Sequence, residues 1–250
     1  MIIGGLQKFS LLDYPNYISA IIFTQGCNFR CHFCYNPMLV WPKLESGKFK
    51  NINSSDNSGE KIEKVYSRFL EDDLFDFLRK RQKKLDAVVI TGGEPTIHKD
   101  LPDFIKKIRK LGFKVKLDTN GTNPEMLKSL IDKKLIDYIA MDIKGSLENY
   151  AIITGMCLNI DNIKKSIKII TQSGLPYEFR TTVVASLVEK KDIKKIGELI
   201  KGAKKWYLQN FKSDINLVDD SFEKHKPYSL KEMEEMRKIG ETYVDFCDIR

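Results

Sequence analysis

The stretch Leu85–Thr91, which reads Leu-Asp-Ala-Val-Val-Ile-Thr, is followed at once by the turn Gly92-Gly93-Glu94-Pro95. A short run that is rich in β-branched residues and bounded by turn residues is typical of a strand. The apolar residues of this run are nearly continuous, which indicates burial on both faces. Strands of this kind occur in parallel sheets that helices cover. The stretch therefore favours an α/β fold.

The same pattern recurs five more times along the 250 residues. The further predicted strands are Tyr17–Phe23, Lys114–Thr119, Asp137–Ile143, Tyr177–Val184 and Lys205–Asn210. Helical patterns lie between them, and this alternation predicts parallel strands with right-handed crossovers in one domain over residues 1–250. Six such units fit a partial (β/α)6 barrel or an open doubly wound sheet, and the pattern does not separate the two. In either fold the active site lies beyond the carboxyl ends of the strands.

Several helices carry end signals. Apolar residues at helical spacing predict a helix over Asp192–Ala203. Asn123 before Pro124 is typical of an N-cap followed by the first helical residue. Ser229, with Glu232 three residues later, predicts a capping box at the start of the last helix. By contrast, the polar segment 43–61 is predicted to be a flexible surface insertion.

The composition excludes some classes of protein. No run approaches the ~18 apolar residues that a membrane span needs, and the N-terminal residues do not resemble a secretory signal. We therefore expect a cytoplasmic protein. The net charge of +8 comes from lysines spread over every predicted helix. Because nucleic-acid readers concentrate their basic residues on one element, nucleic-acid binding is not predicted. A weak preference for acidic partners, such as a small acidic electron carrier, is consistent with this charge.

The cysteines form the most informative motif. Cys27, Cys31 and Cys34 have the spacing C-x3-C-x2-C on a loop directly after the first predicted strand, within residues 24–40. Three thiolates on one short loop can bind three irons of a cubane [4Fe–4S] cluster and leave the fourth iron free for a substrate. A zinc site is the alternative, but zinc sites usually pair two C-x2-C units. Cys157 and Cys247 are isolated, and we expect both to be buried as small apolar residues.

These motifs, in this order, resemble the radical S-adenosylmethionine superfamily. The cysteine spacing with Phe33 before the last cysteine is similar to the family signature, and Thr91–Pro95 resembles its Gly-Gly-Glu motif. Leu117–Gly121 and Ala140–Lys144 follow at later strand ends, as in the branch that activates glycyl radical enzymes. The opening phrase Phe9–Pro15 and the turn Asp118–Asn123 are most similar to activating proteins of anaerobic ribonucleoside-triphosphate reductase. The resemblance implies the partial (β/α)6 barrel.

The resemblance also implies roles for strand-end residues. It implies that Gly92, Gly93 and Glu94 contact the ammonium group of S-adenosylmethionine, although a tight turn capped by Glu94 is the structural alternative. Phe33 is expected against the adenine, and Lys144 against the carboxylate or the ribose.

Two carboxylates, Asp118 and Asp142, together with Thr119, are expected at the pocket mouth. The resemblance implies that they hold a monovalent cation beside the cofactor. The structural alternative is an Asx turn at each strand end.

Arg180 lies inside a strand that is otherwise apolar, and a buried Arg is costly unless it is paired. It is predicted to face the anionic cofactor or to form a structural salt bridge. Gln209 ends the sixth predicted strand and is a candidate contact to the ribose or the carboxylate. His98 and His225 show no partner in the sequence that would make either a catalytic base, and we expect both on the surface or in turns.

The activity that the resemblance implies is reductive cleavage of S-adenosylmethionine to methionine and a 5′-deoxyadenosyl radical. That radical would remove a hydrogen from a glycine of a partner glycyl radical enzyme. A flavodoxin- or ferredoxin-type protein would donate the electron, and no general base is needed. The alternatives are a pyruvate formate-lyase-like partner, a small-molecule, RNA or peptide substrate, and a non-catalytic iron–sulfur electron carrier or sensor.

Overall fold

The computed structural model describes residues 1–40, 70–213 and 217–250. The predicted insertion at 43–61 lies outside these ranges. The strands are β1 Ile3–Ser10, β2 Ser19–Thr24, β3 Ala87–Gly92, β4 Lys114–Thr119, β5 Tyr138–Asp142, β6 Tyr177–Val183, β7 Trp206–Asn210 and β8 Cys247–Ile249. The helices are α1 Pro37–Val40, α2 Glu71–Arg81, η1 Pro95–Ile97, α3 Leu101–Lys110, α4 Pro124–Asp132, α5 Tyr150–Thr154, α6 Ile160–Gln172, α7 Lys190–Leu199, η2 Asp220–Lys224 and α8 Leu230–Glu241.

One sheet contains all eight strands in sequence order, from β1 to β8. The strands from β2 to β8 are parallel, which confirms the predicted α/β fold. The sheet extends beyond the six predicted strands at both edges, because β1 adds to β2 in the antiparallel sense and the short β8 adds to β7. The chain therefore forms a single α/β domain of partial-barrel type.

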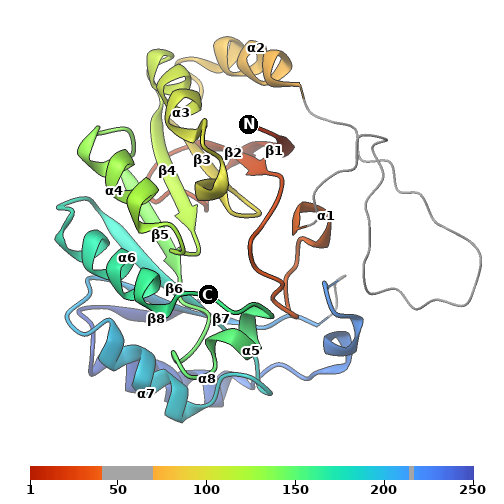
Figure 1. Ribbon diagram of the computed structural model, residues 1–250, viewed down its shortest axis with the longest axis vertical. Helices are drawn as coiled ribbons and strands as arrows, with labels where there is room; N and C mark the ends of the chain where they lie inside the picture. Colours follow the sequence, from red (N-terminus) through yellow and green to blue (C-terminus); the bar gives the residue numbers. More distant parts are fainter. Residues whose placement is uncertain (41–69, 214–216) are drawn as a thin grey trace, which may run out of the picture.

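Helices cover the convex face of the curved sheet, whereas the segment between β2 and α1 passes the open side (Figure 1). The main apolar core lies between this convex face and the helices. It includes Ile90, Leu117 and Ile139 from the sheet and Ile105 and Ile163 from the helices. A much smaller apolar cluster lies on the concave face, around the buried Tyr14 and Tyr138. The rest of the concave face is thus available for polar side chains.

The helix ends follow the predicted signals. The side chain of Asn123 accepts a hydrogen bond from the Met126 N–H (3.1 Å), and Ser229 and Glu232 form the expected capping box. The helix predicted over 192–203 begins two residues earlier and ends at Leu199, because the Asp192 carboxylate accepts from the Glu189 N–H and fixes the start there. No helix in the described ranges is long and apolar enough to cross a lipid bilayer.

The sheet register brings polar residues of neighbouring strands side by side. Asp118 pairs with Ala140, Asp142 pairs with Arg180, and Thr182 pairs with Gln209. Since residues two apart on a strand share a face, Asp118, Asp142 and Arg180 all point to the concave side. The carboxyl ends of the parallel strands therefore carry a cluster of charges.

Candidate active site

The loop that carries the three cysteines, called here the cysteine loop (residues 24–40), is held by its backbone. The Gly26 N–H donates to the Leu39 carbonyl (2.7 Å), and the Arg30 N–H donates to the Thr154 carbonyl at the end of α5 (2.7 Å). The buried Phe29 ring packs edge-on against Tyr150 of α5, with 6.3 Å between centroids. These contacts give the loop a defined shape beside the carboxyl end of β2.

A late segment of the chain also holds the cysteine loop. The Val218 N–H donates to the Cys34 carbonyl (3.2 Å), and the Asp219 N–H donates to the His32 carbonyl (3.1 Å). The His32 ring additionally contacts the Asp219 carboxylate at 3.0 Å. Residues almost two hundred positions apart in the sequence thus meet at this loop.

The three thiols are withdrawn from water. Burial raises the pKa values of Cys27 and Cys31 to about 12, and it raises the pKa of Cys34. The Phe29 N–H opposes this at Cys27, where it donates to the sulfur at 3.4 Å. In the described part of the chain, no three His, Cys, Asp or Glu side chains converge on a point that could hold one metal ion.

The Gly-Gly-Glu turn packs directly against the cysteine loop. The Glu94 N–H donates to the Gly26 carbonyl (2.8 Å), and a Cβ on Gly93 would lie 1.9 Å from that same oxygen. Gly92 has φ of +119°, in the region that L side chains avoid. Glycine is therefore required at both positions because the backbone of the turn lies directly against the backbone of the cysteine loop.

Gly93→Ala should destabilise the fold by about 3 kcal/mol, because the new methyl group has backbone on its far side and no flexible side chain to displace. Thermal unfolding should show a fall in Tm of about 6–12 °C. Gly5→Ala is the matched control, since a Cβ there meets only Phe23 at an ordinary 3.7 Å. Equal Tm values for the two variants would contradict the packing assigned to Gly93.

The Glu94 carboxylate is the centre of a buried hydrogen-bond network. It accepts from the backbone and hydroxyl of Thr96 (3.1 and 2.5 Å), from the Thr119 hydroxyl (2.7 Å) and from the Asn120 N–H (2.6 Å). Burial raises its pKa, and these four donors oppose that change. The turn capped by Glu94, which was the structural alternative for this motif, is present, since the Glu94 side chain caps η1. The same bonds also turn Thr119 toward Glu94, so Thr119 does not join Asp118 on the concave face.

A second hydrogen-bond network joins the end of β4 to the cysteine loop. The Asn120 side chain donates to the Asn28 side chain (2.8 Å), which in turn donates to the Thr122 hydroxyl (2.8 Å). The Thr122 hydroxyl closes the ring by donating to Asn120 (2.7 Å). None of these three residues had been assigned a role from the sequence. Asn28 directly follows Cys27, and this position was the available signal.

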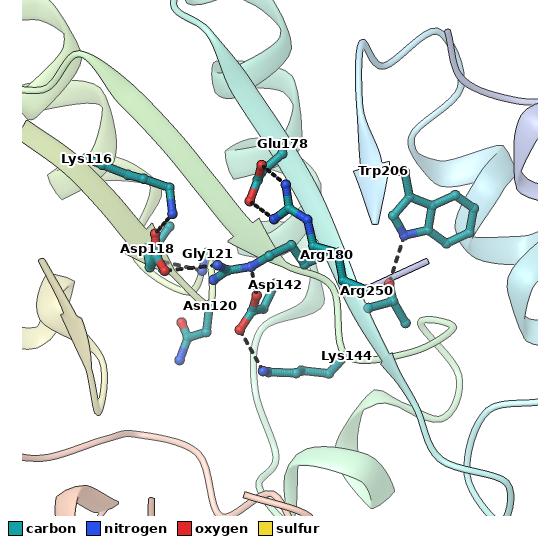
Figure 2. Close-up of polar contacts among 12 residues, drawn as sticks. Lys116, Asp118, Asn120, Gly121, Asp142, Lys144, Glu178, Arg180, Trp206 and Arg250 are labelled. Atoms are coloured by element: carbon teal, nitrogen blue, oxygen red, sulfur yellow. Dashed lines mark hydrogen bonds and ion pairs between the residues drawn. The ribbon is translucent and has the colours of Figure 1, made fainter. Parts of the chain in front are cut away.

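Five charged side chains form a continuous line on the concave face, called here the charged row. Its members, in spatial order, are Lys116, Asp118, Arg180, Asp142 and Lys144. Successive members are joined by ion pairs of 2.7, 2.9, 2.8 and 2.9 Å (Figure 2). The structural salt bridge predicted as one option for Arg180 is therefore present, to two carboxylates at once. No side chain of the row is more than 28% exposed.

Asp142 and Lys144, at one end of the charged row, keep each other ionised. Burial alone would raise the pKa of Asp142, but the charges of Arg180 and Lys144 outweigh it and hold that pKa well below its usual range. Burial likewise opposes the charge of Lys144, yet Asp142 raises the pKa of the ammonium. The same ammonium lowers the pKa values of the cysteine thiols. Lys144, the last member of the charged row, thus extends the charge of the row to the cysteine loop.

Asp142→Asn should reduce stability by about 3 kcal/mol at pH 7, because it leaves Lys144 without its carboxylate partner and leaves Arg180 with only Asp118. The depressed pKa of Asp142 means that its stabilisation is present above about pH 4 and is lost as the pH falls through its folded pKa. Urea unfolding at several pH values should show a flatter acid limb for the variant. Asp132→Asn, which breaks the exposed pair with Lys128, should change little; a steep acid limb in Asp142→Asn would contradict this assignment.

The remaining predicted residues lie in different places. Phe33 is 3% exposed and belongs to the main apolar core, and Gln209 lies on β7 beside Thr182, outside the charged row. Cys247 is buried as expected, but Cys157 is exposed, so the expectation for Cys157 was wrong. It follows the helix-ending Gly155, where the chain has left the core. His98 and His225 each follow a 3-10 helix, in agreement with turn positions.

Lys116 and Tyr150 are the further residues that the sequence analysis missed. Lys116 interrupts the apolar strand β4 just as Arg180 interrupts β6, so the argument from a costly buried charge would have found it. Tyr150 is fully buried, and its hydroxyl accepts from the Lys144 N–H at 3.3 Å. It therefore supports both Lys144 and the ring of Phe29 on the cysteine loop.

A curved parallel sheet with polar strand ends and a thiol-bearing loop at one edge defines an α/β enzyme with a cofactor site at the carboxyl ends of its strands. A model of the Radical SAM superfamily matches residues 21–201. A Methanocaldococcus jannaschii protein, named as a candidate glycyl-radical enzyme activating enzyme, is 33% identical over 254 residues, covering 100% of this chain and 95% of its own length. The chain therefore belongs to the Radical SAM superfamily.

Two further comparisons agree with this placement. The pyruvate formate-lyase-activating enzyme of Clostridium pasteurianum is 26% identical over 241 residues, covering 94% of this chain and 92% of its own length. The structure of Streptococcus suis SuiB bound to S-adenosylmethionine superposes with a TM-score of 0.61 at 16% identity, over 91% of this chain and 49% of that chain. That second likeness is one of fold.

Membership of the superfamily implies a [4Fe–4S] cluster and S-adenosylmethionine as cofactors. The cysteine loop fits such a cluster. It offers three soft sulfur donors in a buried setting, a backbone N–H directed at the Cys27 sulfur and the positive charge of Lys144 nearby. Hydrogen bonds to sulfur, net charge and solvent exposure are the features that tune these clusters.

Proposed function

We propose that this enzyme cleaves S-adenosylmethionine reductively and generates a glycyl radical on a partner enzyme. The proposal rests chiefly on one observation, the convergence of the cysteine loop, the Gly-Gly-Glu turn and the charged row at the carboxyl ends of β2 to β6. Of two relatives that match nearly the whole chain, one is named a candidate glycyl-radical enzyme activating enzyme and the other a pyruvate formate-lyase-activating enzyme. We place this activity in the cytoplasm.

Cys27, Cys31 and Cys34 would hold the cluster. When bound, the cluster supplies one electron and an open iron position to S-adenosylmethionine. The buried thiols need a metal to lose their protons, because burial raises their pKa values. The backbone contacts of the loop would orient the cluster and keep water away from it.

The residues around the loop would bind and orient S-adenosylmethionine. The carbonyls of Gly92 and Gly93 are suited to its ammonium group, while Glu94, whose oxygens accept from Thr96, Thr119 and Asn120, would act by fixing the turn. Lys144, whose charge lowers the pKa of the Cys31 thiol, supplies a positive charge near the loop and suits the carboxylate of the ligand.

Three other assignments follow from position. Asp118, Asp142 and Arg180 would hold Lys144 in place through the charged row. Gln209, further along the concave face, would reach the ribose or the carboxylate. Phe33 would reach the adenine chiefly through its backbone, because its ring lies in the core.

The proposed protein substrate is anaerobic ribonucleoside-triphosphate reductase. The supporting feature is the phrase Phe9–Pro15, which the structure folds into a defined turn. The Ser10 hydroxyl accepts from the Leu12 and Asp13 N–H groups (3.1 and 3.3 Å), and Leu11 and Leu12 are exposed. A flavodoxin- or ferredoxin-type protein would deliver the electron.

The experiment is anaerobic reconstitution with iron and sulfide, followed by mixing with S-adenosylmethionine, a reductant and a candidate reductase. We expect methionine, 5′-deoxyadenosine and a glycyl EPR signal on the reductase. Pyruvate formate-lyase serves as the matched alternative substrate. Products without a glycyl signal on either protein would contradict the proposed substrate class, and absence of both products would point to an electron carrier.

A further inference from the structure

The two carboxylates of the charged row have no oxygen left without a cationic partner. Asp118 accepts from Lys116 through Oδ1 and from Arg180 through Oδ2, at 2.7 and 2.9 Å. Asp142 accepts from Arg180 through Oδ1 and from Lys144 through Oδ2, at 2.8 and 2.9 Å. Each of the four oxygens therefore meets a nitrogen of a positively charged side chain.

The charges of the row also leave no need for an added cation. Three cationic side chains, Lys116, Arg180 and Lys144, face two carboxylates, so the row carries a net charge of +1. A metal cation bound to both carboxylates would lie beside these three groups and would be repelled by them at short range. The arrangement does not fit the monovalent cation that the sequence resemblance implied.

Lys116 is the member of the charged row that pairs with the Asp118 oxygen not bound by Arg180. It lies two residues before Asp118 on the same strand, so both side chains point to the concave face. Its side chain is only 2% exposed, and its ammonium lies 5.8 Å from the centroid of the Tyr138 ring. A lysine buried to this degree requires a paired charge, and Asp118 supplies it.

We propose that the Lys116 ammonium occupies the place of a monovalent cation at Asp118, so that this enzyme needs no Na⁺ or K⁺ at its cofactor site. Lys116 is then a positioning residue. It neutralises Asp118 on one side while Arg180 holds the other, and Arg180 in turn fixes Asp142 and Lys144. The inference depends on the charged row and not on the identity of the partner enzyme.

The test compares thermal unfolding of the full-length protein in NaCl, KCl and tetramethylammonium chloride at one ionic strength. The native protein should have the same Tm in all three salts, within about 1 °C. Lys116→Met removes the charge and keeps the length of the side chain, and it should gain about 3 °C in NaCl or KCl over tetramethylammonium, because a small cation now binds Asp118. Lys116→Arg keeps the charge and should remain indifferent to the salt.

A saturable stabilisation of the native protein by Na⁺ or K⁺ would overturn the proposal, as would a Lys116→Met variant that does not respond to either ion. If Lys116→Met fails to fold, the ²³Na NMR line of the native protein decides the question. We expect no saturable broadening that K⁺ reverses, and such broadening would overturn the proposal. Because none of these measurements uses S-adenosylmethionine or a partner, their outcome is independent of the proposed function.

Discussion

Cys31→Ala should leave a folded protein that binds little iron and releases 5′-deoxyadenosine at least about 1000-fold more slowly than the native enzyme, a loss of about 4 kcal/mol of transition-state stabilisation. Cys31 is the most buried of the three loop thiols, and its replacement leaves two sulfur ligands where three are proposed. The loop backbone does not depend on this side chain, because carbonyls of Leu39 and Thr154 hold it. Iron content, circular dichroism and product analysis after reconstitution check the three parts of this expectation.

Cys247→Ala is the matched control for Cys31→Ala. Cys247 is 3% exposed against 6% for Cys31, but it lies on β8 beside Gly240 and Trp206, far along the sheet from the cysteine loop. This variant should keep its iron and its activity. Product release by reconstituted Cys31→Ala at the native rate would overturn the ligand assignment.

Glu94→Ala should weaken binding of S-adenosylmethionine by about tenfold or more and should cost about 4 kcal/mol of stability. The substitution leaves four buried donors, from Thr96, Thr119 and Asn120, without their acceptor. The turn that packs on Gly26 would loosen as a result, and so would the end of β4. Isothermal titration of the reconstituted protein and urea unfolding measure the two effects.

Glu94→Gln separates the role of the charge from that of the hydrogen bonds, and Glu125→Ala is the matched control. Glu94→Gln keeps one oxygen acceptor for Thr96 and Thr119 but places an amide group against the Asn120 N–H, so it should fall between Glu94→Ala and the native protein. Glu125→Ala changes an exposed residue in the first turn of α4 and should alter neither measurement appreciably. Unchanged affinity in Glu94→Ala would contradict the role given to the turn.

The central strands could be predicted from the sequence because their apolar runs are unbroken. The strand predicted over 114–119 has the observed bounds, and the other five predicted strands agree with β2, β3, β5, β6 and β7 to within two residues at each end. The two edge strands, β1 and β8, could not be predicted from the sequence for physical reasons. β1 contains Gly4 and Gly5 followed by exposed polar residues, and β8 has only three residues, so neither shows a strand pattern.

The candidate site could be predicted as a set of residues but not as a set of contacts. Arg180 was recognised because a charge inside an apolar strand needs a partner, yet its two partners depend on the register of β4, β5 and β6. Lys116 obeys the same rule and was missed among the many lysines of the chain. Thr119 and Asp118 were grouped because they are adjacent, but adjacent strand residues point to opposite faces.

The contacts of Val218 and Asp219 with the cysteine loop have a consequence for biosynthesis. The loop receives these two bonds only after Val218 and Asp219 have left the ribosome. Iron delivered to a nascent chain would meet cysteines whose loop still lacks these two contacts. The loop therefore acquires its full set of backbone contacts only when this late segment packs against it, and a chain without the segment would carry the sulfur ligands on a loop that lacks both bonds.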